Sequence, residues 1–233
     1  ERSWRIPSPY YAAPTSTRAA YSESTLDRYS IGDCHRYDSK FFKRAVIPIM
    51  DANEIACAFT ARSFLQQCKA CSLYHLGDCP ASPYPNNYKW YHENLRSSEM
   101  LYNFHNNKEF YQNEKYAIIV ESCGNVLRCE DAGIKGSVAT FGAKIGEHQF
   151  ELLLGAGVEK LIVCFDGDDA GISGANRIVA KYQKDINIII PNLELPKRII
   201  DQDEYQTDLG DFPSNIVGKN MRKVLKRYGL NTD

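Results

Sequence analysis

The residues best suited to chemistry in this chain are two aspartates, Asp166 and Asp168, in the phrase Asp-Gly-Asp-Asp-Ala-Gly at residues 166–171. They follow the apolar run Leu161–Phe165, and apolar residues at helical spacing come after them. A strand that delivers two carboxylates onto a small-residue turn before a helix is a common way to hold a divalent cation for phosphate chemistry. A solvated turn is the alternative, because Asp and Gly also favour loops.

The elements around these aspartates are expected to bring a third acid to the same place. Glu121 ends the apolar run Ala117–Val120, and further runs expected to be strands cover Ser137–Phe141 and Ile186–Ile190. Stretches expected to be helical separate the runs, at residues 126–132, 150–154 and 172–182. Alternating strands and helices predict an α/β fold with a parallel four-stranded sheet, whose ligands bind at the carboxyl ends of the strands. We therefore expect Glu121 to converge with the aspartate pair.

This arrangement resembles the toprim domain, which is shared by bacterial-type primases, topoisomerases and some nucleases. The resemblance covers residues 115–212 and rests on a glutamate after the first strand and an Asp-x-Asp after the third. It implies that Asp166 and Asp168 bind Mg²⁺ or Mn²⁺, and that Glu121 holds a metal ion or handles a proton. One position departs from bacterial primases, which have an Asp four residues after the glutamate, where this chain has Asn125. The lost charge predicts a different number or affinity of metal ions.

The family also has a further acidic element after the fourth strand, and two places in this chain qualify for it. Asp201 and Asp203 resemble the Asp-Pro-Asp of bacterial primases, whereas Asp208, in the phrase Thr-Asp-Leu-Gly-Asp, resembles a phrase of phage relatives. The glycine of that phrase offers a tight turn, which slightly favours Asp208. Both alternatives stay open, as does a purely acidic surface loop over residues 194–211.

The residues before the toprim-like segment indicate which class of toprim-containing protein this chain resembles. Two strands are expected within residues 44–63, and the phrases Lys-Trp-Tyr-His at 89–92 and Leu-Tyr-Asn at 101–103 follow them. Their order is similar to the N-terminal half of the catalytic core of DnaG-type primases, which extends the resemblance over residues 25–212. It implies a smaller α+β subdomain in front of the toprim domain.

Three cations of this region are candidates for binding phosphates of nucleic acid or nucleotides: Arg62, Lys89 and Arg96. Lys and Arg interleaved with aromatic residues can bind phosphates while the rings stack on bases. Each of the three is otherwise an ordinary surface cation. Trp90, Tyr91 and Tyr102 fit the core better than a base platform.

Three of the eight cysteines of the chain and one histidine lie in one loop at metal-ligand spacing: Cys68, Cys71, His75 and Cys79. Three thiolates and one imidazole suit tetrahedral Zn²⁺, and the spacing resembles a shortened zinc knuckle. We predict a structural zinc site in the loop 68–79, which either braces a loop that lines the template groove or contacts DNA itself, and bracing is the preferred interpretation. Unrelated thiols are the alternative.

Composition and patterning set the organisation of the chain. With 233 residues it has room for two subdomains, and we expect these segments: an extended arm at 1–24, a primase-like subdomain at 25–113, a toprim domain at 114–212 and a basic amphipathic helix at 213–233. A net charge of −1 leaves nucleic-acid binding to local patches.

No apolar stretch reaches the roughly 20 residues of a membrane span, which predicts a cytoplasmic protein, in the bacterial host if the origin is a phage. The missing initiator Met suggests a fragment.

The resemblance implies the catalytic core of a DnaG-type primase that makes short RNA primers by metal-dependent nucleotidyl transfer. Its expected partners are single-stranded DNA, ribonucleoside triphosphates and a replicative helicase. A toprim-type nuclease and a non-catalytic nucleic-acid-binding module are the alternatives. Because acids at the edge of a sheet seldom support the core, Asp166→Ala and Asp168→Ala are expected to leave the fold intact.

Overall fold

The computed structural model describes residues 21–36, 38–51, 54–65, 68, 71–74, 88–195, 198–200, 203–205 and 209–231 of the chain. Two compact units divide these residues: Glu23–Leu95 belongs to the first, and Tyr21, Ser22 and Arg96–Asp233 belong to the second. The sequence placed this boundary after residue 113 instead. Residues 96–113 therefore lie in the unit that contains the parallel sheet. Among the described residues, no helix is both long and apolar enough to cross a membrane.

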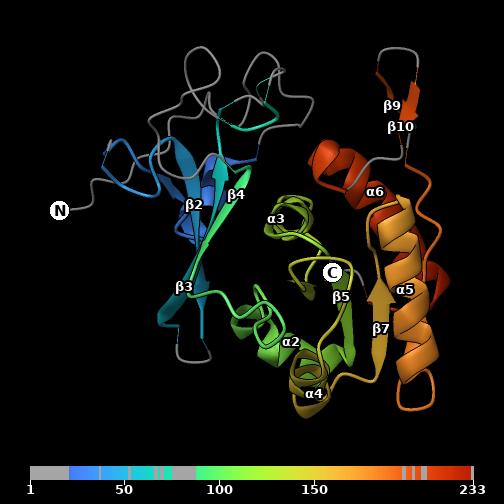
Figure 1. Ribbon diagram of the computed structural model, residues 1–233. Coiled ribbons are helices and arrows are strands. Elements are labelled where there is room, and N and C mark those ends of the chain that lie inside the picture. The colour runs from blue at the N-terminus through green and yellow to red at the C-terminus, as the bar shows by residue number, and fades with distance from the viewer. Residues whose placement is uncertain are drawn as a thin grey trace. The chain divides into compact units, whose positions relative to one another are not determined.

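The first unit is built on an antiparallel sheet of order β1-β2-β3-β4 (Figure 1). Its elements are α1 Glu23–Arg28, β1 Gly32–Asp33, β2 Arg44–Met50, β3 Ala56–Ser63 and β4 Trp90–Glu93. The expected strand pair within residues 44–63 is confirmed as β2 and β3, whose register pairs Arg44 with Ser63. Residue pairs Thr60–His92 and Arg62–Trp90 continue the ladder into β4, so these four side chains lie on one face of the sheet.

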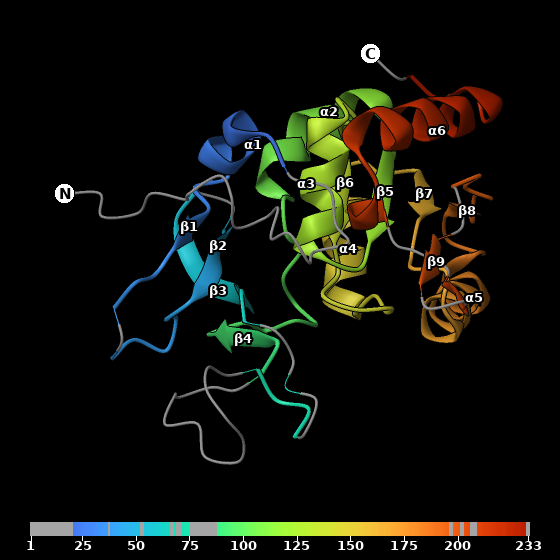
Figure 2. The ribbon, with the colours of Figure 1, turned by 90° about the horizontal axis from the view of Figure 1, so that it is seen from above.

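The second unit contains the parallel sheet predicted from the sequence, with strand order β6-β5-β7-β8. Figure 2 shows these four strands side by side, with α5 on one side of them and α6 on the other. The strands are β5 Tyr116–Val120, β6 Ser137–Ala139, β7 Lys160–Val163 and β8 Asn187–Ile189. The helices are α2 Lys108–Glu114, α3 Cys123–Asp131, α4 Glu147–Gly155, α5 Asp169–Tyr182 and α6 Ser214–Arg227. Every residue of β5 is buried, as a central parallel strand covered on both faces requires.

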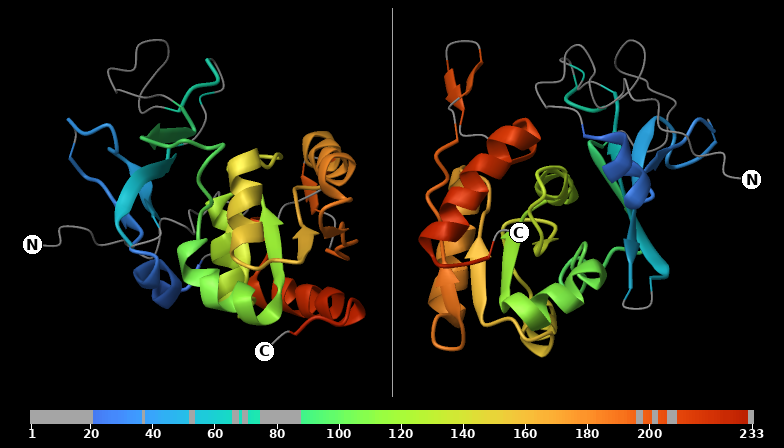
Figure 3. Two further views of the ribbon diagram at one scale, coloured as in Figure 1. Left: turned by 90° about the horizontal axis from the view of Figure 1, so that it is seen from below. Right: turned by 180° about the vertical axis from the view of Figure 1, so that it is seen from behind.

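Three short elements complete the second unit: the 3₁₀ turns η2 His105–Asn107 and η3 Leu209–Asp211, and an antiparallel hairpin of β9 Arg198–Ile200 with β10 Asp203–Tyr205. Figure 3 shows this hairpin standing clear of the parallel sheet. An acidic surface loop was one of the alternatives for residues 194–211, and no hairpin was expected from the sequence. The turn η3 packs against α3, and α3 packs against α6.

The core of the second unit joins β5 and β7 to the helices on one face of the sheet. Side chains of α4 and α5 meet there, and the rings of Phe150 and Tyr182 stack with centroids 3.8 Å apart. The α6 helix buries its apolar face, as its spacing predicted: Val217, Met221, Val224 and Leu225. Four of its cations are exposed, Lys219, Lys223, Lys226 and Arg227, and Lys223 pairs with Glu194 at 2.6 Å. Arg222 is partly buried and donates to the carbonyl of Ala132 at 2.7 Å.

A dipeptide from the start of the described chain packs on α3. The Tyr21 hydroxyl donates to the carbonyl of Gly124 at 3.1 Å, and the Ser22 amide and hydroxyl donate to Asp131 at 3.0 and 2.6 Å. The guanidinium of Arg128 lies over the Tyr21 ring, 4.4 Å from its centroid, and Nη1 is 3.4 Å from Oδ2 of Asp131. The side chains of Arg128 and Asp131 are 1% and 4% exposed, so this is a buried ion pair.

Candidate metal centre

Glu121 and Asp166 meet where the order of the parallel strands reverses. The chain leaves β5 for β6 on one side and later returns to lay β7 on the other side, so the ends of β5 and β7 flank a switch point of the kind where open α/β sheets bind ligands. Glu121 directly follows β5, and Asp166 follows β7 by three residues. Oε1 of Glu121 accepts a hydrogen bond from the backbone N–H of Asp166 at 2.9 Å. Residues 45 positions apart thus meet at the predicted edge of the sheet.

The carboxylate of Asp166 is oriented by an amide side chain. Nδ2 of Asn125 donates to Oδ1 of Asp166 at 3.2 Å. Asn125 lies in the first turn of α3, whose N-cap is Ser122, and its side chain is fully buried. The sequence marked Asn125 only as a lost negative charge. Its hydrogen-bonding role was missed, although its position four residues after Glu121 was the signal that singled it out.

Asp168 is the N-cap of α5. Its Oδ1 accepts a hydrogen bond from the backbone N–H of Gly171 at 2.8 Å, and its backbone is extended, as N-cap residues are. The start of a helix also favours a negative charge. This carboxylate therefore has a structural duty besides any part in metal binding.

Gly171 allows the first turn of α5 to pack against the turn that carries Asp166. A Cβ added at Gly171 would lie 2.0 Å from the carbonyl oxygen of Asp166 and 2.9 Å from Oε1 of Glu121. Contacts below 3.0 Å to a backbone atom demand a shift of the chain. The first turn of α5 is thus pressed directly onto the acid-bearing turn, and the glycine in the phrase at residues 166–171 has a packing reason.

Comparison with known proteins agrees with this geometry. Residues 115–190 match the Toprim domain family.

The chain contains a Toprim domain.

Over 193 residues the chain is 25% identical to the DNA primase of Enterococcus faecalis, in a match that covers 82% of this chain and 29% of that protein. Among solved structures, the zinc-binding and RNA polymerase domains of the Aquifex aeolicus primase share the fold with a TM-score of 0.64 and 18% identity, over 89% of this chain and 53% of that one. The RNA polymerase domain of the Mycobacterium tuberculosis primase DnaG gives a TM-score of 0.66 and 15% identity, over 94% and 74% of the two chains. The fold is therefore that of a DnaG-type catalytic core. The chain spans less than a third of the length of the curated relatives that it matches.

The donor chemistry of the Toprim acids fits a hard divalent cation, which prefers carboxylate oxygens. Glu121 and Asp168 nevertheless each turn one oxygen to a backbone amide. Within the described residues, no three His, Cys, Asp or Glu side chains are arranged so that they could hold a metal ion as they stand. An ion at this edge therefore requires the carboxylates to turn toward a common point, or a further acid to join them.

The candidates for that further acid are only partly described. Asp201 and Asp208 lie outside the described residues, and Asp203 begins β10, of which only the backbone is described. Gly210, two residues after Asp208, lies in η3, and its N–H donates to Oδ1 of Asn125 at 3.2 Å. The chain segment that follows Asp208 is thus tied to the Asp166 carboxylate through Asn125.

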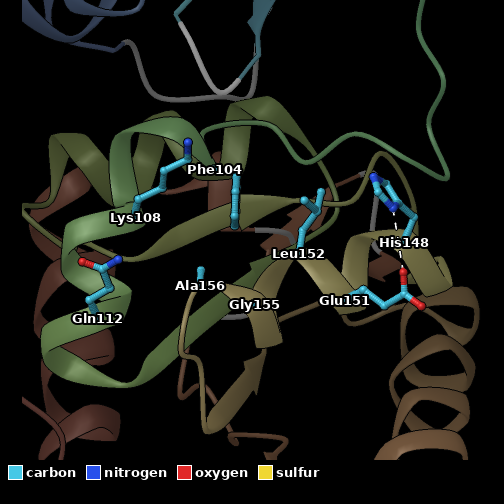
Figure 4. Close-up of a pocket in the computed structure, with 8 residues that line it drawn as sticks. All are labelled: Phe104, Lys108, Gln112, His148, Glu151, Leu152, Gly155 and Ala156. Atoms are coloured by element: carbon cyan, nitrogen blue, oxygen red, sulfur yellow. Dashed lines mark ion pairs between the residues drawn. The ribbon is translucent and has the colours of Figure 1, made fainter.

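A groove of the Toprim unit lies elsewhere, between α2 and α4 (Figure 4). Its volume is about 360 Å³, and its lining includes none of the candidate acids: Phe104, Lys108, Gln112, His148, Glu151, Leu152, Gly155 and Ala156. His148 and Glu151 form an exposed ion pair of 3.9 Å on its wall. This groove takes no part in the metal centre.

The predicted zinc loop is described only at its first two ligands, because His75 and Cys79 lie outside the described residues. Cys68 and Cys71 share a tight turn: the N–H of Cys68 donates to the carbonyl of Leu73, and the N–H of Ser72 to the carbonyl of Cys68, both at 2.8 Å. Both thiols are partly exposed and form no disulfide.

The three candidate phosphate-binding cations belong to different units. The guanidinium of Arg62 on β3 lies over the ring of Trp90 on β4, 5.5 Å from its centroid, and Lys89 directly precedes β4. Arg96 belongs to the Toprim unit and pairs with Glu99 at 2.8 Å. Tyr102 is buried as expected, whereas Trp90 and Tyr91 are only partly covered.

Proposed function

We propose that this chain is the catalytic core of a DnaG-type DNA primase, a nucleotidyltransferase that makes short RNA primers on single-stranded DNA. The observation that carries the proposal is the meeting of Glu121 with Asp166 beside Asp168 at the switch point of a Toprim sheet. The DnaG-like fold of the chain and its likeness to DNA primases support it.

In this proposal Asp166 and Asp168 hold Mg²⁺ or Mn²⁺, with Glu121 and with Asp208 or the pair Asp201 and Asp203. When bound, such ions supply charge neutralisation to a triphosphate and to its leaving group. Glu121 also serves as the acid or base near the reacting hydroxyl. The single-stranded template and ribonucleoside triphosphates are the substrates, and a replicative helicase is the partner. We place the reaction in the cytoplasm, in that of a bacterial host if the origin is a phage.

The cations of the first unit position phosphates by charge. Arg62 is held by the Trp90 ring, and such a pre-oriented guanidinium loses little entropy on binding a phosphate. Lys89 is exposed and directly precedes Trp90 in the sequence. In the Toprim unit, Arg96 is a separate candidate for binding a phosphate. A structural Zn²⁺ bound by Cys68, Cys71, His75 and Cys79 braces the loop that joins β3 to β4.

A primer-synthesis assay tests this function. The chain is incubated with single-stranded DNA, labelled ribonucleotides and Mn²⁺, and we expect short labelled RNA. Asp166→Asn keeps the shape of the side chain and removes its charge, and should reduce synthesis by about two orders of magnitude or more.

Two other outcomes would each refute the proposal. Shortened DNA without RNA product would identify a Toprim nuclease. DNA binding that needs no divalent ion and gives no product would identify a non-catalytic module, which the present bonding of Glu121 and Asp168 to backbone amides would then explain.

A further inference from the structure

One polar side chain is completely enclosed beside the acids. Asn125 is 0% exposed, and its amide group spans two elements: Nδ2 donates to Oδ1 of Asp166, and Oδ1 accepts from the N–H of Gly210, both at 3.2 Å. It thus joins the turn after β7 to η3, from a position 41 residues before Asp166 and 85 residues before Gly210.

The amide of Asn125 can make both of these bonds at once, whereas an ionised carboxylate could make only the second. The carboxylate of Asp166 only accepts and the N–H of Gly210 only donates, so the residue between them must both donate and accept. An ionised aspartate at position 125 could accept from Gly210, but it would set a second carboxylate against Asp166. Two carboxylates so close repel each other, so one of them takes up a proton unless a cation lies between them.

The η3 turn is fixed by the same contact. Leu209 and Gly210 are buried, and η3 packs on α3. The chain that leads into η3 includes residues 201–208, where the last acid of the metal centre is expected. Asn125 therefore connects Asp166 with Gly210 of η3, and η3 directly follows the segment in which the fourth acid is expected.

We propose that Asn125 is a positioning residue of the metal centre. It holds the Asp166 carboxylate in place in the metal-free protein and connects it to the η3 turn. An aspartate at position 125 would add a negative charge next to Asp166, and the asparagine does not. A site organised in this way needs no cation to keep position 125 and Asp166 together. This inference rests on the proposed metal centre but does not require primer synthesis.

The test compares two substitutions with a matched control. Asn125→Leu removes both bonds at similar volume, and Asn125→Asp keeps the acceptor but adds a charge. Asn107→Leu is the control, because Asn107 is also buried and bonds the backbone of Asn103 and Gly136 at 3.0 and 2.9 Å. Mn²⁺ binding is measured by calorimetry without nucleotide or DNA, and exchange of the Gly210 amide by NMR.

We expect Asn125→Leu to bind Mn²⁺ about tenfold more weakly, as loss of a residue that orients a ligand does, and to speed exchange of the Gly210 amide. Asn107→Leu should lower stability while changing neither readout. Asn125→Asp should keep the Gly210 amide protected and gain more thermal stability from Mn²⁺ than the parent does, since the cation relieves the new repulsion.

The inference is overturned if Asn125→Leu binds Mn²⁺ like the parent, or if the parent binds no Mn²⁺ at all. An Asn125→Asp variant to which Mn²⁺ gives no more stability than to the parent would also overturn it, even if the leucine variant does not fold. A parent that binds Mn²⁺ and responds as expected but makes no primers would sink the primase function alone and leave the role of Asn125 standing.

Discussion

At the scale of single residues, Glu121 and Asp168 are candidate metal ligands that also form hydrogen bonds to the protein backbone. Glu121 accepts from the backbone of Asp166, and Asp168 caps α5. The sequence led us to expect that losing either aspartate would leave the fold intact. That expectation does not take into account that Asp168 caps α5. The first residue of a helix is hard to predict from sequence, and here the first turn of α5 packs at Gly171 against the turn that carries Asp166.

Asp168 allows capping and metal binding to be separated. Asp168→Ala removes both and should lower the free energy of unfolding by about 0.5–2 kcal/mol. Asp168→Asn keeps a good N-cap and should leave stability nearly unchanged while still weakening Mn²⁺ binding and primer synthesis. Chemical denaturation and calorimetry on the two variants check this. Equal stability of the alanine and asparagine variants would contradict the cap.

At the scale of elements, the sequence predicted what repeats along the chain and missed what does not. The four parallel strands were visible because each lies within a largely apolar run, and α6 because its apolar face has helical spacing. The helix α2 was missed, since Tyr111 is its one fully buried side chain and gives no period. The place of the acids followed from the sheet, whereas their partners Asn125 and Gly171 depend on tertiary distances that no local pattern carries.

The β3–β4 pair gives a prediction about pH. The His92 ring stacks on Trp90 with centroids 6.5 Å apart, its Nδ1 lies 2.9 Å from Oγ1 of Thr60, and partial removal from water lowers its pKa below the usual 6.5. The unfolded chain therefore takes up a proton first as pH falls. The free energy of unfolding is therefore not reduced by His92 above about pH 6.5. It decreases as the pH falls below that value, and the decrease ends below the lowered pKa of the folded state.

Urea denaturation between about pH 5 and 8 measures this effect, because His92 titrates within that range when unfolded. His92→Gln removes the titrating ring, so its stability should fall less than that of the parent between neutral and acidic pH. If the two proteins lose stability in parallel, the environment of His92 does not perturb its protonation.

At the scale of the whole molecule, charge is balanced and thiols are abundant. The net charge of −1 means that any attraction for DNA comes from local groups such as the cations of β3 and α6. The thiols divide by environment: Cys123, Cys129 and Cys164 are buried, and burial raises the pKa of each, that of Cys129 to about 12. Cys68 and Cys71 are partly exposed.

This division turns thiol labelling into a test of the zinc loop. Buried thiols of raised pKa should stay unlabelled in the native protein, since the thiolate is the reactive form. If zinc is bound, a chelator should greatly speed the labelling of Cys68 and Cys71, read residue by residue by mass spectrometry. Cys57, also partly exposed but bonded to the carbonyl of Ile49 at 3.3 Å, is the control and should not respond. Chelator-independent labelling of Cys68 would remove the zinc site.

The dipeptide Tyr21–Ser22 has a practical consequence for anyone who wishes to isolate the Toprim half. That half is discontinuous in sequence, because Tyr21 and Ser22 belong to it and cover the Arg128–Asp131 ion pair, although Glu23–Leu95 belongs to the other unit. Trimming the protein at Arg96 would open one of its most deeply enclosed guanidinium groups to solvent and strip Asp131 of two donors. A stable excised half would need that short leader grafted back, or the ionic couple beneath it exchanged for apolar side chains of similar volume.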